Sequence, residues 1–114
     1  MGTISGDTLR GHLETMVLAA LEHGDAHGFE ILHRLEDGGC GLLRLREGTL
    51  YPALYRLEKA GCIRGKWEDN SLRHRGPRRR IYRLNAKGRR ELAARRERWR
   101  EFVRVVGGIV GGAP

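Results

Sequence analysis

The chain has 114 residues, of which 39% are hydrophobic and 32% are charged, and its formal net charge is +8. This length and composition fit one folded domain with a single modest core, and they exclude wholesale disorder and a second core. No run approaches the roughly 18–20 apolar residues that a membrane-spanning helix needs.

The start of the chain predicts a cytoplasmic protein. Residues 1–14 lack the basic region and apolar stretch of a secretory signal, and Gly6 stands where a myristoylation motif needs a hydroxyl residue. Cys40 and Cys62 form no C-x-x-C motif, so we expect small buried hydrophobic side chains in a reducing compartment rather than a disulfide or a sensor pair.

Two amphipathic helices are predicted in the first third of the chain. The first spans residues 9–22 and stops at Gly24, because apolar side chains recur there at three- and four-residue steps. The second follows Asp25, which can act as its N-cap, and runs to about Leu35 before residues 37–39 end it. The residues expected to face the core are Leu9, Leu13, Met16, Val17, Ala20, Leu21, Ile31, Leu32 and Leu35.

A third helix is predicted over residues 47–60, with Gly61 at its end. Pro52 is compatible with this helix if it sits near the first turn, where its missing N–H matters least. One arc of the helix is apolar and carries Leu50, Ala53, Leu54, Leu57 and Ala60. The opposite arc carries Gly48, Pro52, Tyr55 and Lys59, flanked by Thr49, Arg56 and Tyr51.

A β-hairpin with a charged tip follows. Ile63 and Trp67 alternate with charged residues in the first strand, and Tyr82 and Leu84 share one face of the second, residues 78–84. Residues 70–77 between them are polar, turn-rich and basic. We expect Trp67 to face inward, in the core.

A last helix is predicted over residues 86–106, with Asn85 as its cap. Leu92, Trp99 and Val106 are seven residues apart, while Phe102 and Ile109 form a second seven-residue series. Only about two to three heptads fit, which excludes a long coiled coil. The glycines that follow predict fraying after Val106, so residues 107–114 are expected to form a flexible tail.

Positive charge is concentrated in the second half of the chain. Residues 1–61 contain 6 Lys/Arg and 9 Asp/Glu, whereas residues 62–100 contain 15 and 4. This asymmetry suggests a surface for a polyanion, although charge alone leaves a solvated cationic face as an equal alternative.

Three helices and a basic hairpin are typical of a winged helix-turn-helix, a mainly α fold with a small β-hairpin. The second helix of such a motif lies in the DNA major groove, which assigns base reading to residues 47–60. Arg suits bidentate contact with guanine, Lys59 is better placed for phosphate, and wing cations touch backbone or minor groove. The predicted DNA-contacting residues are Thr49, Tyr51, Pro52, Tyr55, Arg56, Lys59, Arg73, His74, Arg75, Arg78 and Arg79. For Tyr51, Pro52 and Tyr55 the alternative is packing at the helix entry, which is strongest for Tyr51.

Three segments resemble the PadR family of transcriptional regulators, and the resemblance covers roughly residues 9–106. Residues 27–31, His-Gly-Phe-Glu-Ile, are similar to the H-G-Y-E-I opening of the family's second helix. Residues 48–58, GTLYPALYRLE, are similar to its recognition-helix signature. Residues 76–88, GPRRRIYRLNAKG, are similar to its wing and the start of its final helix. One segment alone would be suggestive, but three in this order are specific.

The resemblance implies a winged-helix DNA-binding part in residues 1–85, a dimerisation helix in residues 86–106, and repression that a small effector relieves. The expected partners are a second copy of the chain and a two-fold-symmetric operator in double-stranded DNA. With one C-terminal helix before its glycine tail, the chain resembles the family's short subgroup. Pro77, inserted before the wing arginines, departs from the family pattern.

Trp99 has two interpretations. Together with Leu92, Phe102 and Val106 it can form the dimer seam. A tryptophan at this place also resembles the multidrug-sensing members of the family, which hold flat aromatic compounds between subunits. That second interpretation predicts a site for a planar aromatic effector. Its residues would be Trp99, Arg95, Arg96 and Val103.

Other chemistries find little support in the sequence. His23 and His27 are separated by the helix-breaking Gly24 and Asp25, and His33, Cys40 and Cys62 fit no structural-zinc spacing. We find no nucleophile–base pair and no phosphate-binding glycine loop, so we expect no metal, no cofactor and no enzyme activity. A winged helix used only as a protein–protein module remains the alternative to a DNA-binding regulator.

Overall fold

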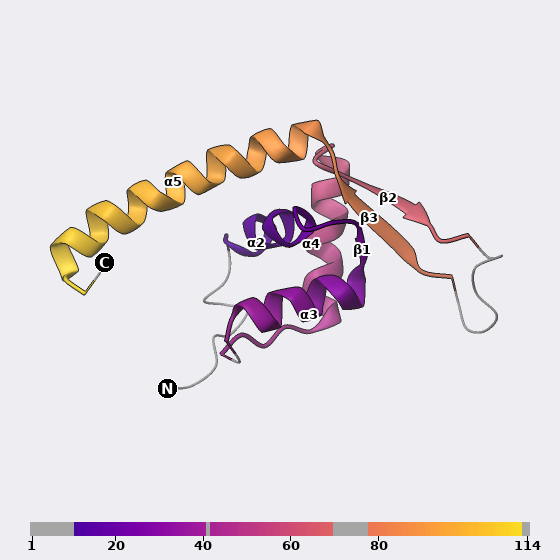
Figure 1. The fold of residues 1–114 in the computed structure, drawn as a ribbon, viewed down its shortest axis with the longest axis horizontal. Coiled ribbons are helices and arrows are strands. Elements are labelled where there is room, and N and C mark those ends of the chain that lie inside the picture. Colours follow the sequence, from indigo (N-terminus) through magenta and orange to yellow (C-terminus); the bar gives the residue numbers. More distant parts are fainter. Residues whose placement is uncertain (1–10, 41, 70–77, 113–114) are drawn as a thin grey trace.

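The computed structural model describes residues 11–40, 42–69 and 78–112. Figure 1 shows a body of short helices beside a small sheet, with one long helix extending away from it. The elements are α2 (Leu13–Leu21), β1 (Ala26–His27), α3 (Gly28–Gly38), α4 (Glu47–Lys59), β2 (Ile63–Trp67), β3 (Arg80–Leu84) and α5 (Ala86–Val110). The predicted fold class, mainly helical with a small hairpin, is confirmed. In the described part of the chain no helix has the length and apolar character needed to cross a membrane.

The core lies between α2, α3, α4 and one face of the sheet. Val17, Ile31 and Leu54 are fully buried, and Leu92 of α5 joins the same cluster. Of the residues predicted to face inward, Met16 and Leu32 are only partly buried, and Leu9 lies outside the described residues. Ala60 is exposed, contrary to prediction, because α4 ends at Lys59 and Ala60 is its C-cap.

The N-cap of α3 is His27, so the prediction of Asp25 is wrong. His27 Nδ1 accepts a hydrogen bond from the Glu30 N–H at 3.4 Å, and the Glu30 carboxylate accepts one from the His27 N–H at 3.1 Å. This reciprocal pair is a capping box. Asp25 instead accepts hydrogen bonds from Nε and Nη2 of Arg83, at 3.0 and 2.9 Å, because β1 intervenes and pairs with β3.

The sheet has three antiparallel strands in the order β1-β3-β2, one more than the predicted hairpin. Ile63 pairs with Leu84 at the end of the hairpin near the core, and Trp67 pairs with Arg80 at the opposite end. Trp67 is 52% exposed, so the prediction of a buried Trp67 is wrong. Its position at the outer end of β2 carries it beyond the helices that cover the inner residues.

Pro52 lies in the second turn of α4, because the helix begins at Glu47, so the condition of a first-turn position is not met. Proline cannot donate to the carbonyl of Gly48, four residues earlier. Both Pro52 and Gly48 are exposed, so water can satisfy that carbonyl. The proline is tolerated because it lies on the solvent side of the helix.

Helix α5 begins at Ala86 with Asn85 as N-cap, as predicted. The Asn85 Oδ1 accepts a hydrogen bond from the Gly88 N–H at 2.8 Å. The helix continues past the predicted end at Val106 to Val110, where Gly111 with φ of 86° follows it. Gly107 and Gly108 therefore lie within the helix, and the predicted helix end at Val106 is four residues too early.

The start of α5 is joined to the end of α4. Asn85 Nδ2 donates to the Gly61 carbonyl and Lys87 Nζ to the Ala60 carbonyl, both at 2.7 Å. These donors occupy carbonyls that have no partner within α4. Gly88 is buried beside them, and a Cβ there would overlap the Cys62 carbonyl oxygen.

We predict that Gly88→Ala lowers the free energy of unfolding by about 1–3 kcal/mol, because the added methyl group forces α5 away from the Cys62 carbonyl. Gly108→Ala is the matched control on the same helix, since a Cβ at Gly108 meets nothing within 4 Å. This control should raise the free energy of unfolding by about 0.5–1 kcal/mol. Urea denaturation of both variants tests the joint, and equal stability of the two would contradict it.

Candidate nucleic-acid interface

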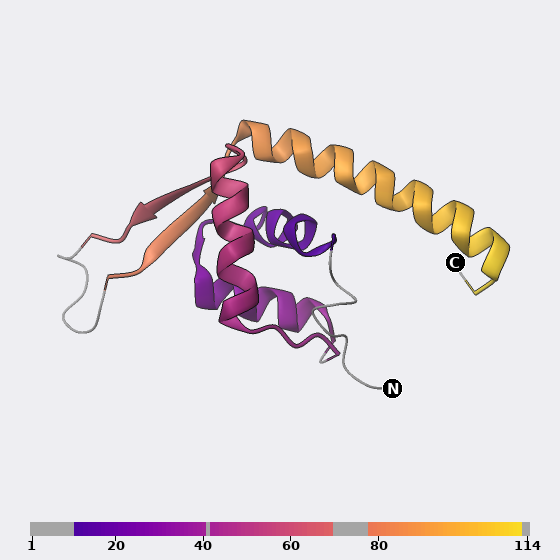
Figure 2. The ribbon, with the colours of Figure 1, turned by 180° about the vertical axis from the view of Figure 1, so that it is seen from behind.

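No element among the described residues covers the outer face of α4. Figure 2 shows α4 in front of the other helices, with no element of the described chain across its outer side. The buried Leu50, Ala53, Leu54 and Leu57 hold the opposite face against the core. All six residues predicted on this helix to contact DNA are exposed: Thr49, Tyr51, Pro52, Tyr55, Arg56 and Lys59.

The two tyrosines of α4 have different surroundings. Tyr55 is 65% exposed, and the Lys59 ammonium lies 5.9 Å from its ring centroid, a spacing suited to a cation–π contact. Tyr51 is 40% exposed and its hydroxyl packs against Gly28, where any Cβ would overlap it. Tyr51 therefore holds α4 against the start of α3, while Tyr55 projects into solvent.

Arg56 lies on the flank of α4 that faces α2. Its Nε is 3.4 Å from Oε2 of Glu14. The guanidinium group is more than half exposed, and exposed pairs of this kind contribute only about 0–1 kcal/mol. Arg56 can therefore exchange this partner for a phosphate or a base at small cost.

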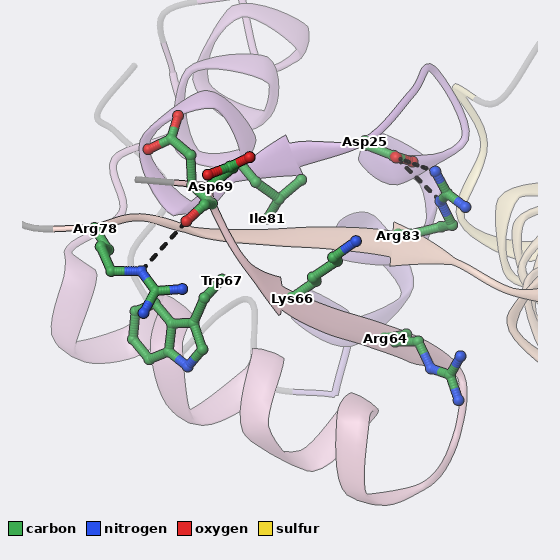
Figure 3. Close-up of a pocket in the computed structure, with 9 residues that line it drawn as sticks. Asp25, Arg64, Lys66, Trp67, Asp69, Arg78, Ile81 and Arg83 are labelled. Atoms are coloured by element: carbon green, nitrogen blue, oxygen red, sulfur yellow. Dashed lines mark hydrogen bonds and ion pairs between the residues drawn. The ribbon is translucent and has the colours of Figure 1, made fainter. Parts of the chain in front are cut away.

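The three consecutive arginines of the wing occupy three different places. Arg78 lies 5.8 Å from the Trp67 ring centroid and donates to the Glu68 carbonyl at 3.3 Å (Figure 3). Arg79 is exposed, with Nη1 at 2.6 Å from Nε2 of His27. Arg80 is half-buried and pairs with Glu58 of α4. Arg73, His74 and Arg75 lie outside the described residues.

Two further cations stand at the start of α4 and were missed by the sequence analysis. Arg44 and Arg46 are exposed, whereas Leu43 before them and Leu45 between them are buried. The alternation Leu-Arg-Leu-Arg was the signal that could have found them. Both guanidinium groups can reach a polyanion that approaches the N-terminal end of α4.

The face of the sheet turned away from α4 also carries positive charge. It forms an open hollow of about 690 Å³ whose cations are Arg64, Lys66, Arg78 and Arg83 (Figure 3). Asp25 neutralises Arg83, and its hydrogen bond and charge raise the pKa of that guanidinium above the ordinary value. The hollow also contains Glu68 and Asp69, so its charge is mixed.

The residues predicted to bind an effector lie along α5. Trp99 is 50% exposed. Its ring stacks on that of Phe102, with centroids 5.8 Å apart and an interplanar angle of 17°. It also makes a T-shaped contact with His12, with ring centroids 5.5 Å apart. Val103 is half-buried. Leu92, expected in the dimer seam, is already covered within the chain's own core.

Both arginines of the predicted effector site already have partners. Arg96 donates to both carboxylate oxygens of Glu22 at 2.9 and 2.7 Å, which holds the pKa of Glu22 below its usual value. Arg95 donates to Glu91 at 2.9 Å and to Thr15 at 3.2 Å, and the pKa of Glu91 is lowered in the same way. These contacts tie the first half of α5 to α2.

Side chains that could bind a metal ion do not cluster in the described part of the chain. Within residues 11–40, 42–69 and 78–112, no three His, Cys, Asp or Glu side chains are grouped to hold a metal ion. Cys62 is buried as predicted, but Cys40 is exposed because it lies in the turn after α3, with φ of 54°. Burial raises the pKa of the Tyr82 hydroxyl.

Comparison with known proteins gives one consistent result. Residues 17–94 match the sequence profile described as "Transcriptional regulator PadR-like family". An uncharacterised protein of Lysinibacillus sphaericus is 28% identical over 103 residues, which are 90% of this chain and 92% of that protein.

Solved structures show the same similarity. A transcriptional regulator from Clostridium thermocellum is 30% identical with a TM-score of 0.81, over 92% of this chain and 99% of that one. A PadR family transcription regulator from Clostridium difficile is 28% identical with a TM-score of 0.77, over 89% of this chain and 100% of that one. A PadR-like transcriptional regulator from Bacillus cereus is 28% identical with a TM-score of 0.76, over 94% of this chain and 99% of that one.

Proposed function

Because the chain belongs to the PadR-like family of transcriptional regulators, we propose that it is a homodimeric repressor that reads a two-fold-symmetric operator and is released by a small aromatic effector. The family assignment makes it a DNA-binding regulator. The repression, the dimer and the effector are the proposal.

The observation that carries the proposal is the outer face of α4, which no described part of the chain covers and which has cations at both of its ends. Arg44 and Arg46 stand before the helix, and Lys59 stands in its last turn. Tyr55 and Arg56 lie between them and carry hydrogen-bonding groups that suit base edges, once Arg56 exchanges Glu14 for the DNA. A helix of this kind beside a basic wing fits the major groove, with the wing at backbone or minor groove.

We predict that α4 and the wing make separable contributions to DNA binding. Arg56→Ala or Tyr55→Ala should change the preferred operator sequence, because these side chains face base edges. Arg79→Ala should weaken binding to all sequences alike and reduce the log–log salt slope by about 0.9, because it removes one phosphate contact. Half-sites should lie about 10 bp apart, one helical turn.

Selection from a random duplex pool, followed by gel shifts at several salt concentrations, measures both effects. Equal and non-selective losses from all three variants would remove α4 from the base-reading role. Binding that is weak and independent of salt would favour the alternative, a winged helix used only as a protein–protein module.

The second half of α5 supports the proposed dimer. Trp99, Phe102, Val106 and Ile109 are exposed apolar residues on adjoining positions of the helix. Figures 1 and 2 both show this part of α5 extending beyond the other helices and the sheet. An apolar stripe on an isolated helix is unfavourable in water, and a second copy of α5 is a partner of matching shape and chemistry.

We predict a particle of twice the 12.9 kDa chain mass by light scattering. Phe102→Glu should give a monomer, because it places a charge in the stripe. Arg100→Glu, on the other side of the helix, is the control and should remain dimeric. A chain that ends at Arg98 keeps the core residue Leu92 and should be a folded monomer. A stable monomer of the full-length chain would refute the dimer.

The effector is proposed to lie against Trp99 in the dimer seam. The half-exposed indole can offer a stacking surface to a planar aromatic compound, and its copy in the partner can offer a second one. Arg95 and Arg96 pair with Glu91 and Glu22, so neither guanidinium group gives this site an unpaired positive charge. Effector binding and DNA affinity would be reciprocally coupled.

We predict that planar aromatic compounds quench the fluorescence of Trp99 and weaken operator binding. Trp99→Phe and Trp67→Phe proteins assign the signal, because the chain has only two tryptophans. Quenching that survives in Trp99→Phe and disappears in Trp67→Phe would place the site elsewhere. If no compound changes either signal, Trp99 is only part of the dimer seam.

A further inference from the structure

One carboxylate of α4 points toward the wing instead of toward solvent. Glu58 Oε2 accepts a hydrogen bond from Nη2 of Arg80 on β3 at 2.6 Å, and one from the Gly65 N–H on β2 at 3.4 Å. The contact therefore joins α4 to both strands of the hairpin. Both charged side chains are only about 30% exposed, at 29% for Arg80 and 31% for Glu58.

The surroundings of Arg80 are shaped to hold its guanidinium group there. Gly65 leaves the necessary space, since a Cβ at that position would lie 2.5 Å from Nε and 2.8 Å from Cζ of Arg80. The Trp67 ring centroid lies 5.4 Å from the same guanidinium group, within the range of a cation–π contact. Arg80 is thus enclosed by a carboxylate, an indole and the backbone of β2.

We infer that Glu58 is a positioning residue, which holds the wing at a fixed angle to α4 through Arg80, so that helix and wing meet DNA together. The inference rests on the proposed function, because it assigns a role in DNA binding to a residue that need not touch DNA. Arg78 and Arg79 directly precede β3 and move with it. Their distance from the base-reading face of α4 therefore depends on the contact between Glu58 and Arg80. Arg80 itself is a structural cation and not a phosphate ligand.

The direction in which DNA affinity changes when Glu58 is neutralised separates this role from that of an ordinary surface carboxylate. A carboxylate on a face that binds a polyanion repels it, so removing such a group should strengthen binding. Removing a positioning group should weaken binding instead, because the wing cations are then no longer held in a fixed position relative to α4. Glu47 is the matched control, as an exposed carboxylate in the first turn of the same helix.

We predict that Glu58→Gln weakens operator binding about tenfold and lowers the log–log salt slope by at least about 0.9, the value for one lost phosphate contact. Glu47→Gln should leave binding unchanged or make it tighter. Gly65→Ala should reproduce the effect of Glu58→Gln, although it removes no charge, because its methyl group displaces Arg80. Circular dichroism and thermal unfolding should show that all three variants are folded.

A second measurement on the same variants needs no DNA. In a Trp99→Phe background the only remaining tryptophan is Trp67. Its emission should shift in Glu58→Gln and Gly65→Ala, where Arg80 leaves the ring, and should not shift in Glu47→Gln. An unchanged Trp67 signal would overturn the inference, whether or not the protein binds DNA. A protein that binds no DNA would refute the proposed function, which is a separate result. Tighter DNA binding by Glu58→Gln, or a lower melting temperature with an unchanged salt slope, would also overturn it.

Discussion

Asn85 and Lys87 donate hydrogen bonds to the carbonyls of Gly61 and Ala60, directly after the last residue of α4, and this joint fixes how α5 begins relative to α4. It ends the helix proposed to read DNA and starts the helix proposed to form the dimer. Gly88 is needed there because any side chain would meet the Cys62 carbonyl. In the proposed dimer, a change in the angle between the two copies of α5 would therefore be transmitted to α4 through these hydrogen bonds.

The positive charge of the second half of the chain is divided among several tasks. Arg96 and Arg95 anchor α5 to α2, Arg83 secures β3 to the loop before β1, and Arg80 joins the wing to α4. Arg78 and Arg79 remain at the exposed end of the hairpin. A net charge alone consequently overstates the surface available to a polyanion, since part of it is neutralised within the fold.

The helices, the hairpin and the outer residues of α4 could be predicted because each depends on local spacing. Leu50 and Leu54 repeat with the period of a helix, and Asn85 can cap the helix that follows it. The wrong predictions concern contacts between distant segments. Asp25 is a good N-cap by composition, but Arg83, 58 residues later, takes its carboxylate. Trp67 alternates like a buried residue, yet its place at the far end of β2 leaves it exposed.

By itself the sequence determined the type and order of the helices and of the two hairpin strands, and most of the side chains that each helix turns to the core. It also carried the three segments by which the family could be recognised. Only the tertiary structure decided which arginine neutralises which carboxylate, where β1 joins the sheet and that Tyr51 packs on Gly28. The physical reason is that periodicity and capping act within a few residues of the chain. Ion pairs and close backbone contacts join residues that are neighbours only after folding.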